Sequence, residues 1–339
     1  MENKKILFIN LVDASFIKMD ERILREHFQV ITFKFKYRKG WRLIPEIIRE
    51  FFFVFFNISK VDIVYVWFAD YHAVIPTILG RMFGKKVVTV IGGYDAANEP
   101  DLNYGVKTLL LGRLSAPLVL HFATHLLPVT RFTFNDMLKN FGGKLGNKST
   151  VIYNCFNDIF KCEIEKERND QVVTICLAHS KITVIRKGVD YYVELARKIP
   201  EIDFYIVGVT SGAKDFLETN KPDNVKLIEK IPQQELKELL CRSKVICQFS
   251  RYEAFGIALL EGISAGCYPV GLDYGGTSEI LENDLGLKID TLDLDRGKEA
   301  ISEALRKQII DVIPIRKDIE KRFAIEVRKK LLVDYLNNI

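Results

Sequence analysis

Residues 243–273 read SKVICQFSRYEAFGIALLEGISAGCYPVGLD. The apolar run SKVICQFS predicts a β-strand, GIALLEGISAG predicts a helix, and CYPVGLD predicts a second strand. A strand, a helix and a strand in this order favour a parallel sheet covered by helices. The loop before the helix carries Glu253, and the second turn of the helix carries Glu261. These two carboxylates, in an otherwise largely apolar unit, are the first candidates for a functional site.

The same alternation of strands and helices runs along the whole chain. In the first half, the predicted strands are KKILFIN, QVITFKF, VDIVYVWF, KKVVTVI, HLLPVT and STVIYN. The second half contains three further predicted strands before SKVICQFS and CYPVGLD, namely QVVTICLAHS, IDFYIVG and NVKLIE. Two such series predict an α/β protein with two Rossmann-like, doubly wound domains. The length of 339 residues agrees with two domains, because a single core rarely grows beyond about 250–300 residues.

The domain boundary is predicted in the polar, turn-rich segment NCFNDIFKCEIEKERNDQ, residues 154–171. We therefore expect one domain at residues 1–155 and a second at residues 156–319. In open α/β sheets, ligands bind beyond the carboxyl ends of the strands. Two such domains facing one another would form a cleft lined by strand-end loops, and we expect the chemistry to lie there.

The composition excludes several classes of function. Apolar residues make up 48% and charged residues 27% of the chain, as in ordinary globular proteins. A formal net charge of +5 is no nucleic-acid signature, so no nucleic-acid partner is expected. Residues 1–5 lead directly into a strand, and the apolar stretch 114–129 is short and contains two prolines. We therefore expect a cytoplasmic protein with neither a signal peptide nor a transmembrane segment.

The chain has six cysteines, and no two of them form a Cys-x-x-Cys pair. Most lie in apolar, strand-like runs, so we expect buried thiols rather than disulfides or a zinc site. The six are Cys155, Cys162, Cys176, Cys241, Cys247 and Cys267.

The loop that carries Glu253 has the features of an anion-binding site. Gly256 opens the following helix without a side chain, and the first amides of a helix favour anions. A diphosphate there would have Glu253 on one side and Glu261 on the other. The alternative is that both carboxylates only stabilise the helix N-terminus. Glu261 favours the functional interpretation, because a carboxylate among apolar neighbours requires a partner.

Two further loops of the second domain could bind phosphate. The segment AHSKITVIRKG, residues 178–188, carries Lys181 and Lys187 at a strand end, and lysines bind phosphate oxygens as point charges. Surface lysines are common, so this pattern alone is weak. The segment DYGGTSEIL, residues 273–281, contains a glycine turn that could form a second anion nest.

Taken together, these motifs resemble those of retaining glycosyltransferases of the GT-B fold, family 4, also described as glycosyl transferases group 1. Residues 253–261 match the family pattern E-x-F-G-x-x-x-x-E, and AGCYPVGLDYGGTSEIL resembles its continuation. VIYNCFNDIFK resembles the family's linker, and SKITVIRKG resembles its basic loop. RFAIEVRKKLLVDYL resembles the closing helix, which implies that residues from about 320 to 339 pack back on the first domain.

The resemblance implies roles for these residues. Glu261 would bind the ribose hydroxyls of a nucleotide-sugar, and Glu253, with the backbone of Phe255 and Gly256, would hold the transferring sugar. The catalytic candidates are Glu253, Lys187 and Lys181. The two lysines would neutralise the diphosphate leaving group, so neither a metal ion nor another cofactor is expected. Further donor-binding candidates are Ile257, His179 and Ile231.

The chain also departs from the family pattern. Ser180 and Lys181 stand where the family usually has Gly and Arg, which keeps the charge but loses the guanidinium fork. In the first domain, Gly92 stands at about the place of a family histidine near the sugar. The candidates for polar contacts on the acceptor side are Asp13, His72, Gly92, Gly93, Tyr94 and Asp95.

The segment KFKYRKGWRLIPEIIREFFFVFF, residues 34–56, mixes basic and aromatic residues. One interpretation is a solvated loop followed by a core helix. The other is a segment that lies on an anionic membrane surface, which would place the protein at the inner face of the membrane.

The resemblance implies a transferase whose donor is a UDP- or GDP-sugar bound mostly by residues 171–320. Its acceptor would be a growing glycan or a lipid-linked sugar bound by residues 1–150. Two alternatives stay open. One is a nucleotide-sugar epimerase of the same fold, which would use the donor without an acceptor. The other is a catalytically degenerate transferase that acts as a partner subunit.

Overall fold

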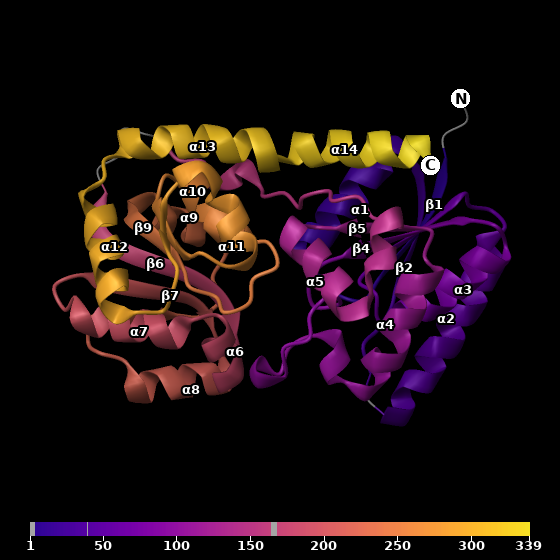
Figure 1. Cartoon of the computed structure of the whole chain (residues 1–339), viewed down its shortest axis with the longest axis horizontal. Helices are drawn as coiled ribbons and strands as arrows, with labels where there is room; N and C mark the ends of the chain where they lie inside the picture. Colours follow the sequence, from indigo (N-terminus) through magenta and orange to yellow (C-terminus); the bar gives the residue numbers. More distant parts are fainter. Residues whose placement is uncertain (1–3, 39, 164–167) are drawn as a thin grey trace. The chain divides into compact units, whose positions relative to one another are not determined.

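The computed structural model describes residues 4–38, 40–163 and 168–339. The chain divides into two compact units: unit 1, Met1–Asn154 with Glu326–Ile339, and unit 2, Cys155–Ile325. Each unit contains one parallel β-sheet with helices packed on it (Figure 1). The predicted α/β class with two Rossmann-like domains is therefore confirmed.

The sheet of unit 1 has the order β2-β1-β3-β4-β5. Its strands are β1 Lys5–Asn10, β2 Gln29–Lys34, β3 Ile63–Trp67, β4 Lys86–Ile91 and β5 His125–Pro128. Its helices are α1 Ser15–His27, α2 Leu43–Ile58, α3 Val74–Met82, α4 Leu110–Phe122, α5 Arg131–Phe141 and α14 Ile325–Asn338, whose first residue still belongs to unit 2. The central strand β3 is buried along its whole length, as expected for a parallel strand covered on both faces.

One predicted strand of unit 1 is wrong. The segment STVIYN, residues 149–154, is not a strand, although it joins β5 through an isolated bridge between Leu126 and Ser149. Backbone amides of Thr150 and Ile152 also donate to carbonyls of β5. The β-branched run is therefore extended, but it lies at the end of unit 1 and makes too few ladder contacts to continue the sheet.

Helices cover both faces of the sheet in unit 1. Val54 of α2, Leu79 of α3 and Val119 of α4 belong to one buried cluster. Leu24 of α1 and Leu332 of α14 belong to the cluster on the opposite face. The C-terminal helix thus completes the core of the first unit.

A buried ion pair joins α14 to α1. Arg328 donates from Nε and Nη2 to the two carboxylate oxygens of Asp20 at 2.6 and 2.7 Å. Asp20 also accepts from the Tyr65 hydroxyl at 2.7 Å and from Trp67 Nε1 at 3.0 Å. Removing one partner of such a buried pair typically costs about 3–5 kcal/mol. This network therefore holds the end of the chain firmly on unit 1.

The sheet of unit 2 has the order β11-β10-β9-β6-β7-β8. Its strands are β6 Asn169–Ala178, β7 Asp203–Val209, β8 Val225–Ile228, β9 Ser243–Gln248, β10 Tyr268–Leu272 and β11 Leu287–Ile289. Its helices are α6 Lys181–Arg186, α7 Val189–Lys198, α8 Ser211–Asn220, α9 Gln233–Arg242, α10 Ile257–Ala265, α11 Gly275–Ile280, α12 Leu294–Arg306 and α13 Ile309–Phe323. The short edge strand β11 was not predicted, because three residues carry too little periodicity to identify a strand.

The expectation of six free thiols is wrong for one pair. Cys162 and Cys241 form a disulfide, with a Cα–Cα distance of 5.9 Å. They lie 79 residues apart in the sequence, so their spacing gave no indication that the fold brings them together. The cysteines at positions 155, 176, 247 and 267 are free and buried, as predicted.

Candidate functional site

In unit 2, the loops that follow β6 and β9 meet in an ion pair. Lys187, directly after α6, donates from Nζ to Oε2 of Glu253 at 2.7 Å. Only 21% of the lysine side chain and 13% of the glutamate side chain are exposed. The same Oε2 accepts from Gln248 at 3.2 Å and from Ser250 at 3.3 Å. The fold therefore brings together two candidate catalytic residues that lie 66 positions apart.

Two glycines allow the Glu253 loop to adopt its shape. Gly256 has a φ of 103°, and a Cβ there would lie 2.7 Å from Oε1 of Gln248. The amide of Gly276 donates to the carbonyl of Glu253 at 2.8 Å. A Cβ on Gly276 would lie 2.5 Å from the Cα of Phe255. Both positions therefore require glycine, and α10 begins at the residue that follows Gly256.

Arg251 fixes the position of the loop that carries Lys187. Its guanidinium donates to the two carboxylate oxygens of Asp190 at 2.7 and 2.8 Å and to the carbonyl of Ile185. Its backbone amide donates to the carbonyl of Arg186 at 2.8 Å. Arg251 thus holds the last turn of α6 and the first turn of α7, with Lys187 between them.

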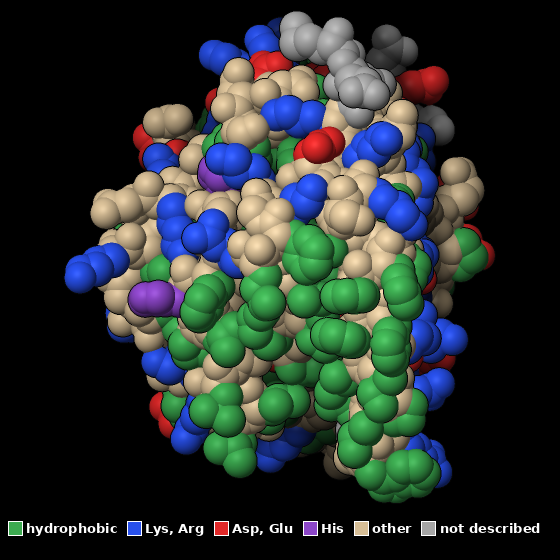
Figure 2. Space-filling view, turned by 90° about the vertical axis from the view of Figure 1, so that its right-hand side faces the viewer, with side chains coloured by type: hydrophobic (Ala, Val, Ile, Leu, Met, Phe, Trp, Pro, Cys, Tyr) green, Lys and Arg blue, Asp and Glu red, His purple; other side chains and the backbone are tan. Residues whose placement is uncertain are grey.

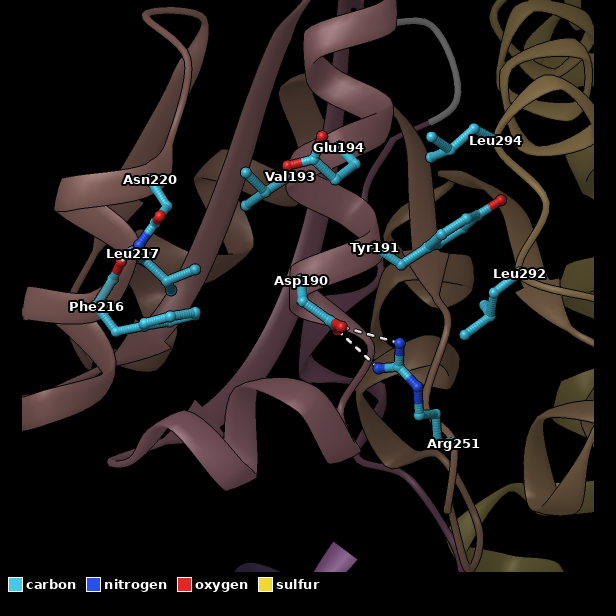
Figure 3. Close-up of a pocket in the computed structure, with 10 residues that line it drawn as sticks. All are labelled: Asp190, Tyr191, Val193, Glu194, Phe216, Leu217, Asn220, Arg251, Leu292 and Leu294. Carbon is cyan, nitrogen blue, oxygen red and sulfur yellow. Dashed lines mark hydrogen bonds and ion pairs between the residues drawn. The ribbon is translucent and has the colours of Figure 1, made fainter. Parts of the chain in front are cut away.

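The Arg251–Asp190 pair lies on the wall of a pocket of about 350 Å³ (Figure 3). In the close-up, the guanidinium and the carboxylate point toward each other, with Tyr191 beside them and Phe216 across the pocket. None of the predicted site residues lines this pocket. We therefore interpret the Arg251–Asp190 ion pair as a support for the Lys187 loop and not as part of the donor site.

Glu261 lies in the second turn of α10 and is half-buried. Burial raises the pKa of its carboxyl group to about 7. Among the residues that the structure describes, Glu261 has neither a hydrogen-bond partner nor an ion-pair partner. Its carboxyl group is therefore available to accept hydrogen bonds from the hydroxyl groups of a ligand.

The remaining donor-side candidates are arranged less tightly. The ammonium group of Lys181 lies 5.1 Å from the ring centroid of Phe216 in α8. The two predicted lysines therefore contact different residues, since Lys187 pairs with Glu253. His179 is exposed between β6 and α6, and Ile231 is half-buried between β8 and α9. Phe255 is buried, with its ring 5.4 Å from that of Phe323. Ile257, also half-buried, is the first residue of α10.

In unit 1, Asp95 joins the ends of β3 and β4. Its Oδ1 accepts from the amides of Gly92 and Gly93 at 2.9 and 3.0 Å, and its Oδ2 accepts from the amide of Ala69 at 2.9 Å. The side chain is fully buried, and this burial raises its pKa to about 7. Because backbone amides donate to both oxygens, Asp95 holds the strand-end loops together. Its contact with an acceptor stays a prediction.

Gly92, which replaces the family histidine, lies under the ring of Phe68. A Cβ on Gly92 would lie 2.3 Å from Cε1 of Phe68. Phe68 has a φ of 69°, in the left-handed region that a bulky residue rarely adopts. Such backbone strain is concentrated at functional sites. The place of the missing histidine is therefore taken by a strained aromatic side chain.

Other acceptor-side candidates differ in accessibility. His72 is fully buried and its Nε2 lies 2.9 Å from the carbonyl oxygen of Trp67. Burial lowers the pKa of His72 to about 4, and its contact on the acceptor side stays a prediction. Asp13 is exposed and pairs with Lys18 at 2.9 Å. Tyr94 is half-buried against Tyr104, with ring centroids 5.5 Å apart.

Sequence reasoning missed Asp70, which follows β3 beside His72. Burial raises the pKa of its carboxyl group, while the Tyr71 amide and the Ser115 hydroxyl donate to Oδ1 at 2.7 and 3.3 Å. The negative charge of Asp70 also contributes to the raised pKa values of Tyr71 and Tyr94. A polar residue at the carboxyl end of a central strand was the available signal.

No group of three or more His, Cys, Asp or Glu side chains in the described part of the chain is arranged to hold a metal ion.

Comparison with known families matches residues 164–323 to glycosyl transferases group 1. The match covers nearly all of unit 2. Residues 164–323 of unit 2 are therefore similar to this glycosyltransferase family. The resemblance predicted from residues 253–261 is thereby confirmed at the level of the family.

Curated relatives include the phosphatidylinositol N-acetylglucosaminyltransferase GPI3 subunit of Saccharomyces cerevisiae, which is 22% identical over 184 residues. That alignment covers 51% of this chain and 40% of the yeast protein. The N-acetyl-alpha-D-glucosaminyl L-malate synthase of Bacillus anthracis is 22% identical over 241 residues, covering 66% of this chain and 60% of the relative. The chain therefore spans less than two thirds of the length of these relatives.

Among solved structures, HepE from Anabaena in complex with UDP and glucose is similar with a TM-score of 0.78 and 16% identity, covering 99% of this chain and 100% of that chain. Sucrose-phosphate synthase from Thermosynechococcus elongatus gives a TM-score of 0.79 at 14% identity, covering 99% and 98%. At these identities the likeness concerns the fold, and it identifies the two Rossmann-like units as the GT-B fold.

Proposed function

We propose that the protein transfers a sugar from a nucleoside-diphosphate sugar to a glycan or lipid-linked acceptor, with retention of anomeric configuration and without a metal ion. The observation that carries this proposal is the Lys187–Glu253 ion pair directly before the N-terminus of α10. A diphosphate at this helix start would compete with Glu253 for the ammonium group of Lys187. The freed carboxylate would then accept hydrogen bonds from the sugar hydroxyls.

Charge stabilisation explains how such a site works without a metal ion. Negative charge develops on the leaving diphosphate as the sugar–phosphate bond breaks, and an oriented cation and helix amides stabilise it. The transition state would resemble an oxocarbenium ion. Glu253 would position the sugar rather than attack it, because its Oε2 still accepts hydrogen bonds from Gln248 and Ser250 when Lys187 has moved to the diphosphate.

A UDP-sugar is the proposed donor. HepE, of the same fold, was solved with UDP and glucose, and the curated yeast and Bacillus anthracis relatives are named for N-acetylglucosamine. Glu261 is the proposed ribose ligand, because its carboxyl group is half-buried and has no partner within the described part of the chain. A lipid-linked acceptor is proposed from the phosphatidylinositol named in the yeast relative. We place the protein in the cytoplasm.

The test is nucleotide release from UDP-N-acetylglucosamine, UDP-glucose and GDP-mannose, with and without a panel of sugar and lipid acceptors. We expect release of UDP that requires an acceptor and persists in EDTA, and a product whose anomeric proton shows the same configuration as the donor. Release that requires no acceptor would instead favour the epimerase. Nucleotide binding without turnover on any acceptor would favour the partner subunit.

A further inference from the structure

Helix α2 of unit 1 exposes its apolar face and buries its acidic one. The residues at positions 46, 50, 54 and 58 face the core, and two of them are Glu46 and Glu50, which are 7% and 1% exposed. The outward face carries aromatic and aliphatic side chains instead. These are Ile44, Ile47, Ile48, Phe51, Phe52, Phe55 and Phe56, with exposures between 37% and 62%. A helix that only packs against a core would have the opposite arrangement.

The exposed apolar side chains continue beyond α2. Phe55 lies with its ring 6.2 Å from Phe83, just after α3. In α4, Leu110 and Leu114 are 77% and 69% exposed. Figure 2 shows these hydrophobic side chains as one broad field on unit 1, with Lys and Arg around it. We call the exposed apolar residues of α2, the end of α3 and α4 the apolar face. Single exposed hydrophobic residues are ordinary, but a contiguous field of this kind marks an interaction surface.

The two glutamates of α2 present no negative charge on the apolar face. Glu46 accepts from the guanidinium of Arg49 and from the amide of Lys36, the latter at 2.7 Å. Burial, with a smaller contribution from the charge of Glu46, raises the pKa of Glu50 to about 9. Glu50 is therefore protonated and neutral at physiological pH.

The exposed charged side chains of the helices that form the apolar face are all positive. Within residues 40–58, 74–82 and 110–122, which the structure describes in full, the only acidic side chains are the two buried glutamates. The exposed arginines of these segments are Arg42, Arg49, Arg81 and Arg113. An anionic partner is complementary to this surface. A second copy of the same face would place these cations against one another.

We propose that the apolar face of unit 1 docks in the interfacial layer of an anionic lipid bilayer. Phe and Trp side chains on one helix face, bordered by arginines, are typical of helices that lie in the headgroup region. No helix among the described residues is long and apolar enough to cross a bilayer. In the docked state, helix α2, with 16 residues, would lie along the membrane surface. This inference does not rest on the proposed glycosyl transfer, although a docked enzyme would meet a lipid-linked acceptor at the surface.

Trp41 offers a direct probe of docking. It precedes α2 and is 74% exposed, whereas Trp67, the only other tryptophan of the chain, is fully buried. With the full-length protein and vesicles of phosphatidylcholine containing phosphatidylglycerol, we expect a blue shift of the Trp41 emission and co-sedimentation of the protein. Trp41→Phe should remove the blue shift but keep most of the co-sedimentation. Vesicles of phosphatidylcholine alone should bind more weakly.

Two pairs of variants separate apolar from electrostatic contributions. Phe52→Ser/Phe56→Ser, at exposed positions, should abolish binding, while Ile310→Ser in unit 2, also exposed at 67%, should have no effect. Each of Arg42→Gln and Arg113→Gln should lower the partition coefficient on anionic vesicles by about fivefold at low salt. Circular dichroism should give unchanged melting temperatures for these surface variants.

Absence of both the blue shift and co-sedimentation on anionic vesicles would overturn the proposal. It would also be overturned by a lipid-independent dimer in analytical ultracentrifugation that the Phe52→Ser/Phe56→Ser variant dissociates, because a second copy would then cover the apolar face. Neither result depends on turnover, so this test fails or succeeds separately from the proposed transferase activity.

Discussion

Lys187 and Glu253 form a largely buried ion pair, 2.7 Å from Nζ to Oε2, at the point where two strand-end loops of unit 2 meet. The pair lies directly before the N-terminus of α10, where helix amides already favour negative charge. In the proposed transferase, one loop would supply the cation for a diphosphate and the other would supply the carboxylate for a sugar. The two groups are already close together without a ligand, which would lower the cost of organising the proposed donor site.

Replacing Lys187 with Gln should lower kcat by about 10²–10³-fold, the usual effect of removing one group that stabilises developing negative charge. Lys214→Gln is the matched control, because Lys214 pairs with Glu229 at the same distance of 2.7 Å, but the side chains are 39% and 60% exposed. The measurement is the initial rate of UDP release with a saturating acceptor. Equal rates for the two variants would remove Lys187 from the reaction.

Arg251→Lys should lower kcat about tenfold, because lysine cannot replace the bidentate contact with Asp190 that holds the Lys187 loop. The loss should nearly disappear when Lys187 is already Gln, since Arg251 acts through Lys187 and coupled residues are not additive. Arg296→Lys, in an exposed pair with Asp290, is the control. Additive losses in the double variant would show that Arg251 acts independently of Lys187.

The sequence predicts only part of this site. Glu253, Gly256 and Lys187 could be found because they stand at strand ends within recognisable patterns. Arg251 could not, since its importance depends on which backbone carbonyls the fold places beside its guanidinium. Lys181 was expected to neutralise the diphosphate together with Lys187, but in the structure its ammonium group lies over Phe216. Periodicity locates loops, whereas the directions of side chains within loops depend on tertiary contacts.

Gly92→Ala should destabilise unit 1 by about 1–3 kcal/mol, because the new Cβ would overlap the ring of Phe68. In a Phe68→Ala background the same substitution should cost clearly less. The measurement is the free energy of unfolding in urea for the parent, the two single variants and the double variant. The same cost in both backgrounds would mean that Phe68 does not limit the space at Gly92.

Glu50 should make the protein less stable as pH rises. Its folded-state pKa of about 9 lies above the ordinary glutamate pKa of 4.5, so between these pH values the folded state holds a proton that the unfolded state has released. The free energy of unfolding therefore falls as pH rises across this window. Glu50→Gln should weaken this dependence and raise stability at pH 8.5 relative to the parent. The measurement is the free energy of unfolding in urea at pH 6 and pH 8.5 for the parent and Glu50→Gln. The same change between the two pH values in both proteins would contradict the assignment.

The fold itself was largely predictable, and the exceptions have identifiable causes. Long β-branched runs gave strands such as β3 and β6, while the three-residue β11 left no readable pattern. The run at residues 51–56 resembled a core helix because hydrophobicity alone does not tell which face is buried. The structure shows that α2 turns Val54 and Ile58 inward and leaves most of its phenylalanines exposed.

The most direct test of the central claim is the thermal shift that UDP produces in the parent protein and in Glu261→Ala. Glu299→Ala, an exposed position in α12 of the same unit, is the control. UDP at about one hundred times its dissociation constant should stabilise the parent and the control by about 2.7 kcal/mol, which corresponds to a rise in Tm of a few degrees. The account predicts a much smaller rise for Glu261→Ala. An equal rise in all three proteins would contradict the assignment of Glu261, and no rise in any of them would contradict the donor site itself.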